Sequence, residues 1–476
     1  MITPLPKSRQ QIRQKHRIEN KSRDALEKAE ALVSLKIKNL LKQVISKNEL
    51  NEIAKETGFL SRSRKLTPYA IIGILLMGCF NGTEDVASLE IMCCFLKKWF
   101  NICILPQSLQ ERLNSRAGAK FIKAVTIKIM MHEANKTIAK LVKKKNKSKI
   151  FHRILLQDST VISLPETVSR IFSGCGGSAS KAAVKCDIII DQNSHLIVRC
   201  KCIAGKMPDN TLSEDILDFA EENDLIIRDM GYFNLSHFSQ MIQKNIKFIS
   251  RLRNNVCIYL NKNDQETVDI VDYLNELKIN KNKIDLNVYV GKEERIPVRL
   301  VGLKVPEEVV KIRSDQYIKA HGRKKIPSED LLKWYEYTLM ITNISREDLS
   351  LNSVLKLYKV RWQIELFFKN MKSQLKVDNF TGENKYRILC LLYSKLALTW
   401  ITALLFAFAQ SMCEGKYIIS FVKFTKWLRE VGNWQEFLAE EDFTELIEGL
   451  KRDMNLLKKC VKKKKVHSNI ENRKSA

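Results

Sequence analysis

The stretch YKVRWQIELFFKNMK, residues 358–372, carries a polar stripe along an otherwise apolar helix. Helical spacing places four polar side chains on one narrow face: Tyr358, Arg361, Glu365 and Lys372. Apolar side chains occupy most of the other positions: Val360, Trp362, Ile364, Leu366, Phe367 and Phe368. We therefore expect most of the helix circumference to be packed into protein. The polar stripe holds a single carboxylate, Glu365, beside two cations and a phenol, and core packing alone does not explain it.

The charge of the chain indicates a polyanionic partner. The 476 residues include 81 Lys and Arg against 53 Asp and Glu, which gives a formal charge of +28 and a pI near 9.5. A surplus of this size favours nucleic acid over an anionic membrane surface as the partner. The length allows two to four domains, and the hydrophobic content of 45% is enough to build their cores.

The cysteines do not follow the spacing of a zinc module. The twelve cysteines include Cys93-Cys94 and Cys200-x-Cys202, but no C-x-x-C repeat with a nearby His. The first residues are basic and lack the apolar run of a secretory signal. We therefore expect reduced thiols and a cytoplasmic protein, associated with the nucleoid when it is bound to DNA.

One segment resembles a membrane span by its length. Residues 388–412 form a long apolar run, which Lys395 interrupts together with several polar side chains. Those side chains are Ser394, Thr399, Thr402 and Gln410. We expect a buried core helix and no membrane partner.

The texture of the sequence changes along the chain. The first 148 residues show helical spacing, and residues 45–68 resemble the first half of a helix-turn-helix, with Gly58 at the turn. Three cations follow that turn: Arg62, Arg64 and Lys65. Residues 105–118 carry a similar weak signal. KKKNKSK, residues 143–149, is typical of a solvated linker, and the chain ends in a basic tail.

Strands follow the linker. RILLQDSTVISL (153–164), a hairpin over 184–206 and DLIIRDMGYF (224–233) are rich in Ile, Val and Leu. Residues 210–223 are expected to form a helix, residues 235–245 another, and KFISRLR (247–253) a further strand. This order predicts a mixed α/β sheet. Residues 254–345 show short alternating strands and predict an all-β insertion with its own lobe, before helices resume.

Two further carboxylates are expected to meet Glu365. Asp158 follows RILLQ and Asp229 follows LIIR, each at the expected end of an apolar strand, where the chemistry of α/β sheets collects. Three carboxylates in a partly dry site repel one another unless divalent cations hold them ionised. An all-oxygen set suits two Mg²⁺ or Mn²⁺ ions, the standard device for displacement at phosphorus. Arg361 and Lys372 would then grip the phosphates of a bound strand.

Each of these residues also has a plain structural interpretation. A strand-end Asp is often a turn residue, Glu365 can pair with Arg361 on a helix surface, and Tyr358 can be part of the core. Their occurrence together favours the active-site interpretation.

The same residues resemble the insertion-sequence-four family of DDE transposases. Tyr358-x2-Arg361-x3-Glu365-x6-Lys372 matches the spacing of that family's YREK signature. QDSTVISLP, residues 157–165, is similar to the block around the family's first Asp, and RDMGYFN, residues 228–234, to the D-x-G-[YF] block around its second. The resemblance covers residues 158–372, and the helical flanks share only its general character.

The resemblance implies a ribonuclease H-like catalytic core, interrupted by the β-rich insertion. It implies a metal-binding triad of Asp158, Asp229 and Glu365. Five further residues would contact DNA: Tyr358, Arg361 and Lys372 at the terminal phosphates, Trp334 by stacking on a flipped base, and Arg251 at another phosphate. The division that follows has five parts: 1–148, a helical DNA-binding domain; 149–253, the first part of the core; 254–345, the insertion; 346–387, the second part of the core; and 388–476, a helical region with a candidate dimer contact and the basic tail.

The function implied is that of a transposase that binds terminal inverted repeats, cuts them and joins the 3′ ends to target DNA. Family members act as a synaptic homodimer and cut through a hairpin intermediate. Two alternatives stay open at this point. One is a ribonuclease H-like nuclease that cuts without joining, and the other is a DNA-binding regulator or decayed transposase that holds ends without cutting.

Overall fold

The computed structural model describes the chain in nine stretches: residues 46–60, 65–80, 86–131, 150–212, 214–277, 283–322, 326–413, 418–431 and 444–458. The chain divides into two compact units. The helical unit consists of Met1–Lys145 and Leu389–Lys459, and the sheet unit of Asn146–Ile388 and Cys460–Ala476. The predicted linker over 143–149, Arg62, Arg64 and the end of the basic tail lie outside the described residues.

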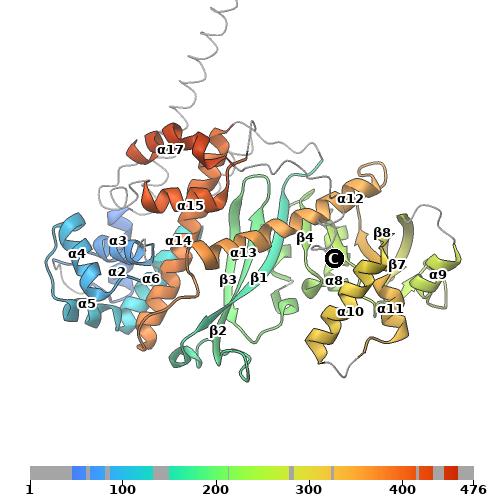
Figure 1. The fold of residues 1–476 in the computed structure, drawn as a ribbon, viewed down its shortest axis with the longest axis horizontal. Helices are drawn as coiled ribbons and strands as arrows, with labels where there is room; N and C mark the ends of the chain where they lie inside the picture. Colours follow the sequence, from blue (N-terminus) through green and yellow to red (C-terminus); the bar gives the residue numbers. More distant parts are fainter. Residues whose placement is uncertain are drawn as a thin grey trace, which may run out of the picture. The chain divides into compact units, whose positions relative to one another are not determined.

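The named elements of the helical unit are all helices (Figure 1). They are α2 Lys47–Glu56, α3 Pro68–Cys79, α4 Leu89–Phe100, α5 Pro106–Leu113, α6 Arg116–Met131, α14 Lys385–Met412, α15 Phe421–Glu430 and α17 Thr444–Leu457. The N-terminal and C-terminal helices bond to each other, since the Thr126 hydroxyl donates to the Tyr393 carbonyl at 3.0 Å. The two helical segments that the sequence analysis described separately, 1–148 and 388–476, thus lie largely in one compact unit.

Helix α14 is a buried core helix, as predicted. It is long and apolar enough to cross a membrane by composition, but 94% of its most apolar window is buried inside the protein. Even Lys395 is only 1% exposed. The apolar surface of α14 therefore closes the core of the protein.

The helix-turn-helix prediction is only partly correct. Helix α2 begins after Ser46, whose side chain accepts a hydrogen bond from the Glu49 amide, and Gly58 turns the chain with a φ of +72°. The helix that follows, α3, is buried at every residue. A fully buried helix cannot enter a DNA groove, so α3 is not a recognition helix.

The sheet unit contains one sheet of nine strands in the order β3-β2-β1-β4-β5-β9-β8-β7-β6. The strands are β1 Ile154–Leu164, β2 Ala182–Asp191, β3 Leu196–Ala204, β4 Leu225–Arg228, β5 Lys247–Arg251, β6 Ile258–Tyr259, β7 Lys283–Val290, β8 Ile296–Lys304 and β9 Tyr337–Thr342. Strands β1 to β3 form an antiparallel meander, and β4 and β5 run parallel to β1. The remaining pairs are antiparallel. The predicted mixed α/β sheet is confirmed.

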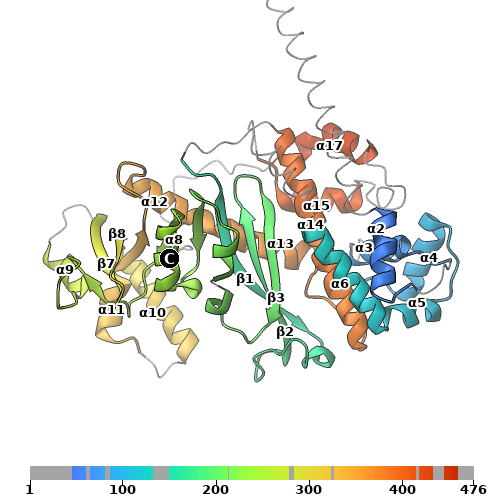
Figure 2. The ribbon, with the colours of Figure 1, turned by 180° about the vertical axis from the view of Figure 1, so that it is seen from behind.

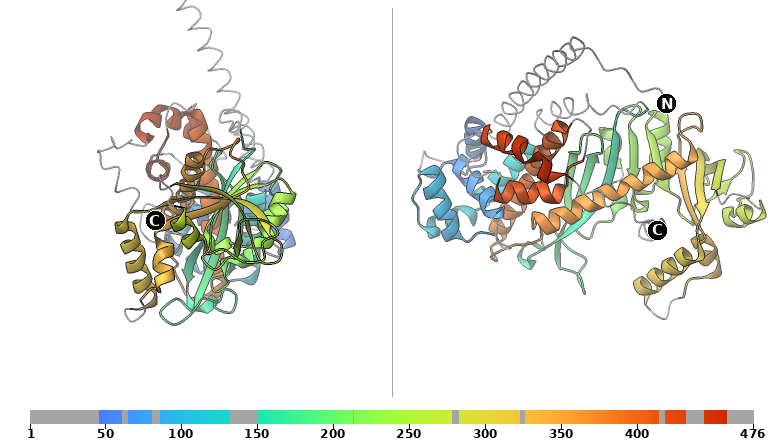
Figure 3. Two further views of the ribbon diagram at one scale, coloured as in Figure 1. Left: turned by 90° about the vertical axis from the view of Figure 1, so that its right-hand side faces the viewer. Right: turned by 45° about the horizontal axis from the view of Figure 1, so that its top comes forward.

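Helices cover both faces of this sheet (Figures 1 and 2). The α-helices of the sheet unit are α8 Leu235–Gln243, α9 Ile270–Glu276, α10 Glu307–His321, α11 Glu329–Tyr335, α12 Leu351–Tyr358 and α13 Trp362–Gln374. Helix α8 packs Phe238 and Met241 into a hydrophobic core that includes Phe248 of β5. Helix α13 lies against β1 on the other face (Figure 3).

The helix expected over 210–223 is not an α-helix. The chain forms two short 3₁₀ segments instead, η2 Asp209–Leu212 and η3 Glu214–Asp218. Polar side chains compete with the helical backbone here, as the Thr211 hydroxyl donates to the Pro208 carbonyl at 2.7 Å.

The predicted all-β insertion is also wrong. Residues 254–345 contain α9, α10 and α11, and their strands extend the core sheet because β9 pairs with β5. The insertion therefore shares a sheet with the core and does not form a separate lobe. The sequence of helix α10 lacks the apolar periodicity that marks a helix, because α10 buries only Val309 and Arg313 and needs no continuous apolar face.

The polar-stripe helix differs from its prediction in two ways. A 3₁₀ turn, η5 Lys359–Arg361, separates α12 from α13. The buried residues of α13 are confined to one stripe of Ile364, Phe368 and Met371, and Trp362 is 43% exposed. A helix on one face of a sheet buries a single stripe, so the expectation of a mostly buried circumference is wrong.

Candidate active site

Asp158 and Asp229 lie on neighbouring parallel strands. The β1–β4 register pairs Gln157 with Arg228. The residue that follows each of these two is one of the carboxylates. Parallel strands run about 4.8 Å apart, which brings both residues to the same place on the sheet. Asp229 directly follows β4, as predicted. Asp158 is not at a strand end, because β1 continues to Leu164 in its pairing with β2.

Glu365 reaches this place from α13, and Arg361 lies between the acids. Arg361 Nη1 is 3.5 Å from Asp158 Oδ2, and Nη2 donates to Glu365 Oε1. Asp229 also acts on this guanidinium, because it raises the pKa of Arg361 together with the other two carboxylates. The structure therefore gathers the three predicted acids around one arginine.

Burial perturbs the first carboxylate strongly. The pKa of Asp158 is raised from 3.8 to about 7, chiefly by desolvation and also by the nearby negative charges of Asp229 and Glu365. The Ser159 amide, which donates to Asp158 Oδ1 at 2.8 Å, and Arg361 oppose this rise. A carboxyl group in this environment takes up a proton near neutral pH unless a nearby cation holds it ionised.

The three acids offer only oxygen ligands to a divalent ion. In the stretches that the structure describes, no three His, Cys, Asp or Glu side chains are arranged as a ready metal site. The guanidinium of Arg361 bridges Asp158 and Glu365 instead. By donor type the oxygens of the three acids suit Mg²⁺ or Mn²⁺, while Arg361 holds the position between Asp158 and Glu365.

Tyr358 and Arg251 belong to the same cluster. Tyr358 is buried, and desolvation raises the pKa of its hydroxyl to about 12. The charges of Arg361 and Arg251 oppose this rise and that of Asp229 adds to it, so all three charges act on the hydroxyl. Arg251 comes from the last position of β5. The cations and the phenol thus lie beside the carboxylates.

Lys372 lies apart from the acids. Its Nζ donates to the Val161 carbonyl on β1 at 2.9 Å. Val161 is three residues beyond Asp158 in an extended strand, which corresponds to about 10 Å. Lys372 therefore lies farther along β1 than the acid cluster.

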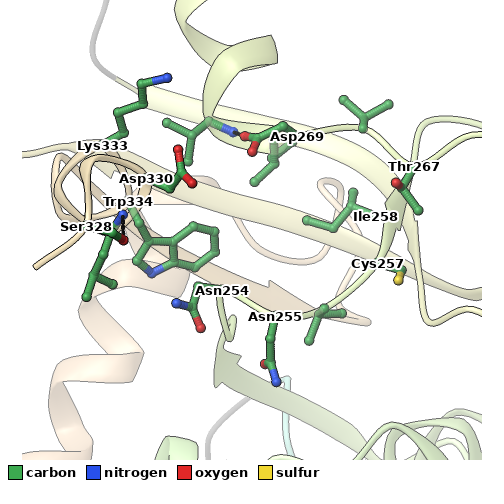
Figure 4. A pocket seen from close by; sticks show the side chains of 15 residues that line it. Asn254, Asn255, Cys257, Ile258, Thr267, Asp269, Ser328, Asp330, Lys333 and Trp334 are labelled. Carbon is green, nitrogen blue, oxygen red and sulfur yellow. Dashed lines mark hydrogen bonds between the residues drawn. The ribbon is translucent and has the colours of Figure 1, made fainter.

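Trp334 lies on a helix, whereas the predicted all-β insertion would have placed it on or beside a strand. It belongs to α11, where it lines a cavity of about 440 Å³ with Asn254 and Asn255 (Figure 4). Its indole also packs against the hydrophobic core of the sheet unit. The cavity is polar along much of its wall, with Asp330 and Lys333 near its rim.

A family model described as "Transposase DDE domain" matches residues 149–401. The chain belongs to this DDE transposase family. The matched residues include Asp158, Asp229 and Glu365. The prediction of a DDE transposase is confirmed at the level of the family. Membership of the insertion-sequence-four family stays a prediction.

Several relatives of this family member are transposases of insertion sequences. The "Transposase for insertion sequence element IS231C" of Bacillus thuringiensis subsp. berliner is 28% identical over 367 residues, which are 74% of this chain and 76% of the relative. The IS1151 transposase of Clostridium perfringens is 24% identical over 372 residues, 75% and 77% of the two chains. A piggyBac transposase synaptic complex with hairpin DNA aligns over 90% of this chain and 86% of its own at 12% identity, with a TM-score of 0.43.

Sequence reasoning missed the polar residues behind the acids of this DDE transposase. Asp187 is fully buried and accepts hydrogen bonds from the Tyr232 hydroxyl at 2.6 Å and from Gln157 Nε2 at 3.1 Å. Asp209 bonds to Ser159 and Lys185. One signal was present, because Asp187 interrupts the apolar strand KCDIIID, and a buried acid requires partners.

Proposed function

We propose that this chain is the transposase of an insertion sequence of the insertion-sequence-four type. It binds the terminal inverted repeats of its element, cuts them by metal-dependent hydrolysis and joins the 3′ ends to target DNA. The observation that carries this proposal is the gathering of Asp158, Asp229 and Glu365 around Arg361. The complete YREK spacing supports it.

The catalytic core is ribonuclease H-like. Its strand order β3-β2-β1-β4-β5, with an antiparallel meander followed by two strands parallel to the first, supports this assignment. The segment 254–345 enters after β5, and the chain returns to the core through α12 and α13. The insertion thereby leaves the acids of β1, β4 and α13 together.

Asp158, Asp229 and Glu365 would hold two Mg²⁺ or Mn²⁺ ions. Such a pair activates the attacking oxygen and stabilises the leaving oxygen in displacement at phosphorus. Arg361, released from the carboxylates, is then free to hold a DNA phosphate with Tyr358. Arg251, beside the same hydroxyl, contributes a second charge to the phosphate. Lys372 extends the contact along β1.

Excision proceeds through a hairpin, in which the freed 3′ hydroxyl attacks the opposite strand. A base is flipped near the strained hairpin, and stacking on the indole of Trp334 offsets the energy of unstacking. The position of Trp334 on the wall of a polar cavity supports this role. The active assembly is a synaptic homodimer in the cytoplasm.

Replacement of Trp334 by Ala is predicted to reduce hairpin formation by about tenfold or more, because base stacking on an aromatic ring contributes roughly 1 to 3 kcal/mol. First-strand nicking should change by less than about twofold, since it precedes base flipping. Gel separation of nicked and hairpin products measures both steps. Trp99→Ala, at a half-buried tryptophan of the helical unit, is the control. Equal loss of both steps would count against stacking by Trp334.

The proposed function is tested with Mg²⁺ and DNA that flanks the gene of this chain. We expect cleavage at the element ends, and joining of a cognate end oligonucleotide with a free 3′ hydroxyl to target DNA. The same oligonucleotide with a 3′-deoxy terminus should bind but not join. Cleavage without joining would indicate the nuclease alternative, and binding without cleavage the regulator.

A further inference from the structure

A polar cluster lies behind the candidate carboxylates, on the opposite face of the sheet. Successive residues of a strand point to opposite faces, so Ser159 faces away from Asp158. The Ser159 hydroxyl donates to Asp209 Oδ1 at 2.8 Å. Lys185 Nζ, from the neighbouring strand β2, donates to the same oxygen at 2.8 Å. Asp209 therefore ties together two strands of the core directly behind the site.

Asp209 also lies against the turn that carries Asp229. A Cβ atom placed on Gly231 would be 3.1 Å from Asp209 Oδ2, tighter than an ordinary contact. Gly231 belongs to η4 Met230–Tyr232, which starts immediately after Asp229, and η2 packs against η4. Glycine at 231 thus lets the turn approach the carboxylate closely. Asp209 contacts one segment next to Asp158 and another next to Asp229.

Asp187 supports the same two segments in a parallel way. It accepts from Gln157, the residue before Asp158, and from Tyr232, at the end of the turn after Asp229. Asp209 and Asp187 therefore span β1 and the β4 turn at two neighbouring points. Packing alone can hold a strand and a turn together. Hydrogen bonds to two carboxylates are directional and also fix the distance between the strand and the turn.

The Lys185–Asp209 pair is half-buried, with Lys185 the better shielded of the two. The side chain of Lys185 is 10% exposed and that of Asp209 is 32% exposed. Asp209 Oδ1 accepts from both Ser159 and Lys185, so this one oxygen joins two neighbouring strands.

We propose that Asp209, held by Lys185, is a positioning residue that sets the spacing of the Asp158 and Asp229 carboxylates for metal binding. This inference rests on the proposed function, because it assumes that those carboxylates bind the ions. Asp209 itself touches neither the ions nor the DNA. It acts through Ser159 on one side and through the Gly231 turn on the other.

The test compares Asp209→Asn with the wild-type full-length chain. Binding of Mn²⁺ without DNA is measured by electron paramagnetic resonance, and first-strand cleavage is measured against Mg²⁺ concentration. We expect the Mn²⁺ affinity to fall by about tenfold or more, the range for residues that orient metal ligands. Cleavage should require a similarly higher Mg²⁺ concentration and recover when that ion is in excess. Binding to end DNA should stay unchanged, which a general loss of structure would not allow.

Two further variants keep the test decisive if Asp209→Asn folds poorly. Ser159→Ala removes one donor and should lower the Mn²⁺ affinity, whereas Ser159→Thr retains the hydroxyl and should restore it. Glu166→Gln, which breaks an exposed ion pair with Lys181 elsewhere in the sheet unit, is the matched control and should behave as wild type.

The outcomes separate this inference from the proposed function. Glu365→Gln is measured alongside, because it removes a proposed ligand itself. If Glu365→Gln cleaves normally, the proposed function is wrong. If Glu365→Gln is inactive while Asp209→Asn and Ser159→Ala bind Mn²⁺ as wild type does, only the positioning role is overturned.

Discussion

Glu365→Gln is expected to reduce first-strand cleavage by about 10³-fold or more and to leave binding to end DNA within about twofold. A divalent ion contributes several kcal/mol to the stabilisation of the transition state, and about 1.4 kcal/mol corresponds to tenfold in rate. The amide keeps the shape of the side chain but loses its charge. Because α13 packs through Ile364, Phe368 and Met371, the fold should not change.

The measurement is single-turnover cleavage of an end duplex, with a filter or gel assay of binding on the same preparation. Glu308→Gln, at an exposed glutamate in the first turn of α10, controls for the loss of one negative charge. Loss of both binding and cleavage would indicate a damaged fold. Wild-type cleavage by Glu365→Gln would refute the assignment of the site.

Asp158→Asn is expected to stabilise the metal-free protein above neutral pH while abolishing cleavage. Burial raises the pKa of Asp158 from 3.8 to about 7 in the folded protein. Between pH 3.8 and about 7, Asp158 is protonated in the folded protein and ionised in the unfolded chain. The folded protein is therefore more stable at low pH, where no ionised carboxylate is buried. This stability is lost as the pH rises through about 7, and the full loss is roughly 4 kcal/mol. Asparagine has no proton to lose and removes this dependence.

Urea unfolding in EDTA measures this effect at about pH 5 and about pH 8. The advantage of Asp158→Asn over wild type should grow by roughly 2 to 3 kcal/mol between them. Added Mg²⁺ should stabilise the wild type more than the variant, because the ion binds the ionised carboxylate. Parallel pH profiles for the two proteins would show that Asp158 is not perturbed in the way described.

Local sequence patterns predicted the parts of the sheet that depend on local pairing. The alternation in 184–206 predicted the β2–β3 hairpin, and the apolar run before Asp229 predicted β4. The position of Asp158 was misjudged because β1 has two neighbours of different length. Strand β4 ends beside Gln157, whereas β2 pairs with β1 as far as Leu164.

Other features depend on contacts that the sequence does not encode locally. The helical unit combines residues 1–145 with residues 389–459, although most of the sheet unit lies between them in the sequence. Helices α9 and α11 are only seven residues long, too short for a clear periodicity. The spacing of the polar stripe did place Arg361 and Glu365 on one helix face, where the two side chains pair. It did not show that Lys372, two turns farther along, reaches Val161 instead.

In the proposed mechanism, Asp158, Asp229 and Glu365 together bind a pair of divalent ions against a DNA phosphate. The most direct measurement is anomalous diffraction from crystals of the protein with Mn²⁺ and end DNA bearing a 3′-deoxy terminus. We predict two Mn²⁺ peaks about 3.5 to 4 Å apart, in contact with these three carboxylates, and Arg361 turned onto a phosphate. Mn²⁺ peaks at other residues, or a DNA complex in which Arg361 still bridges Asp158 and Glu365 with no ion beside them, would contradict the account.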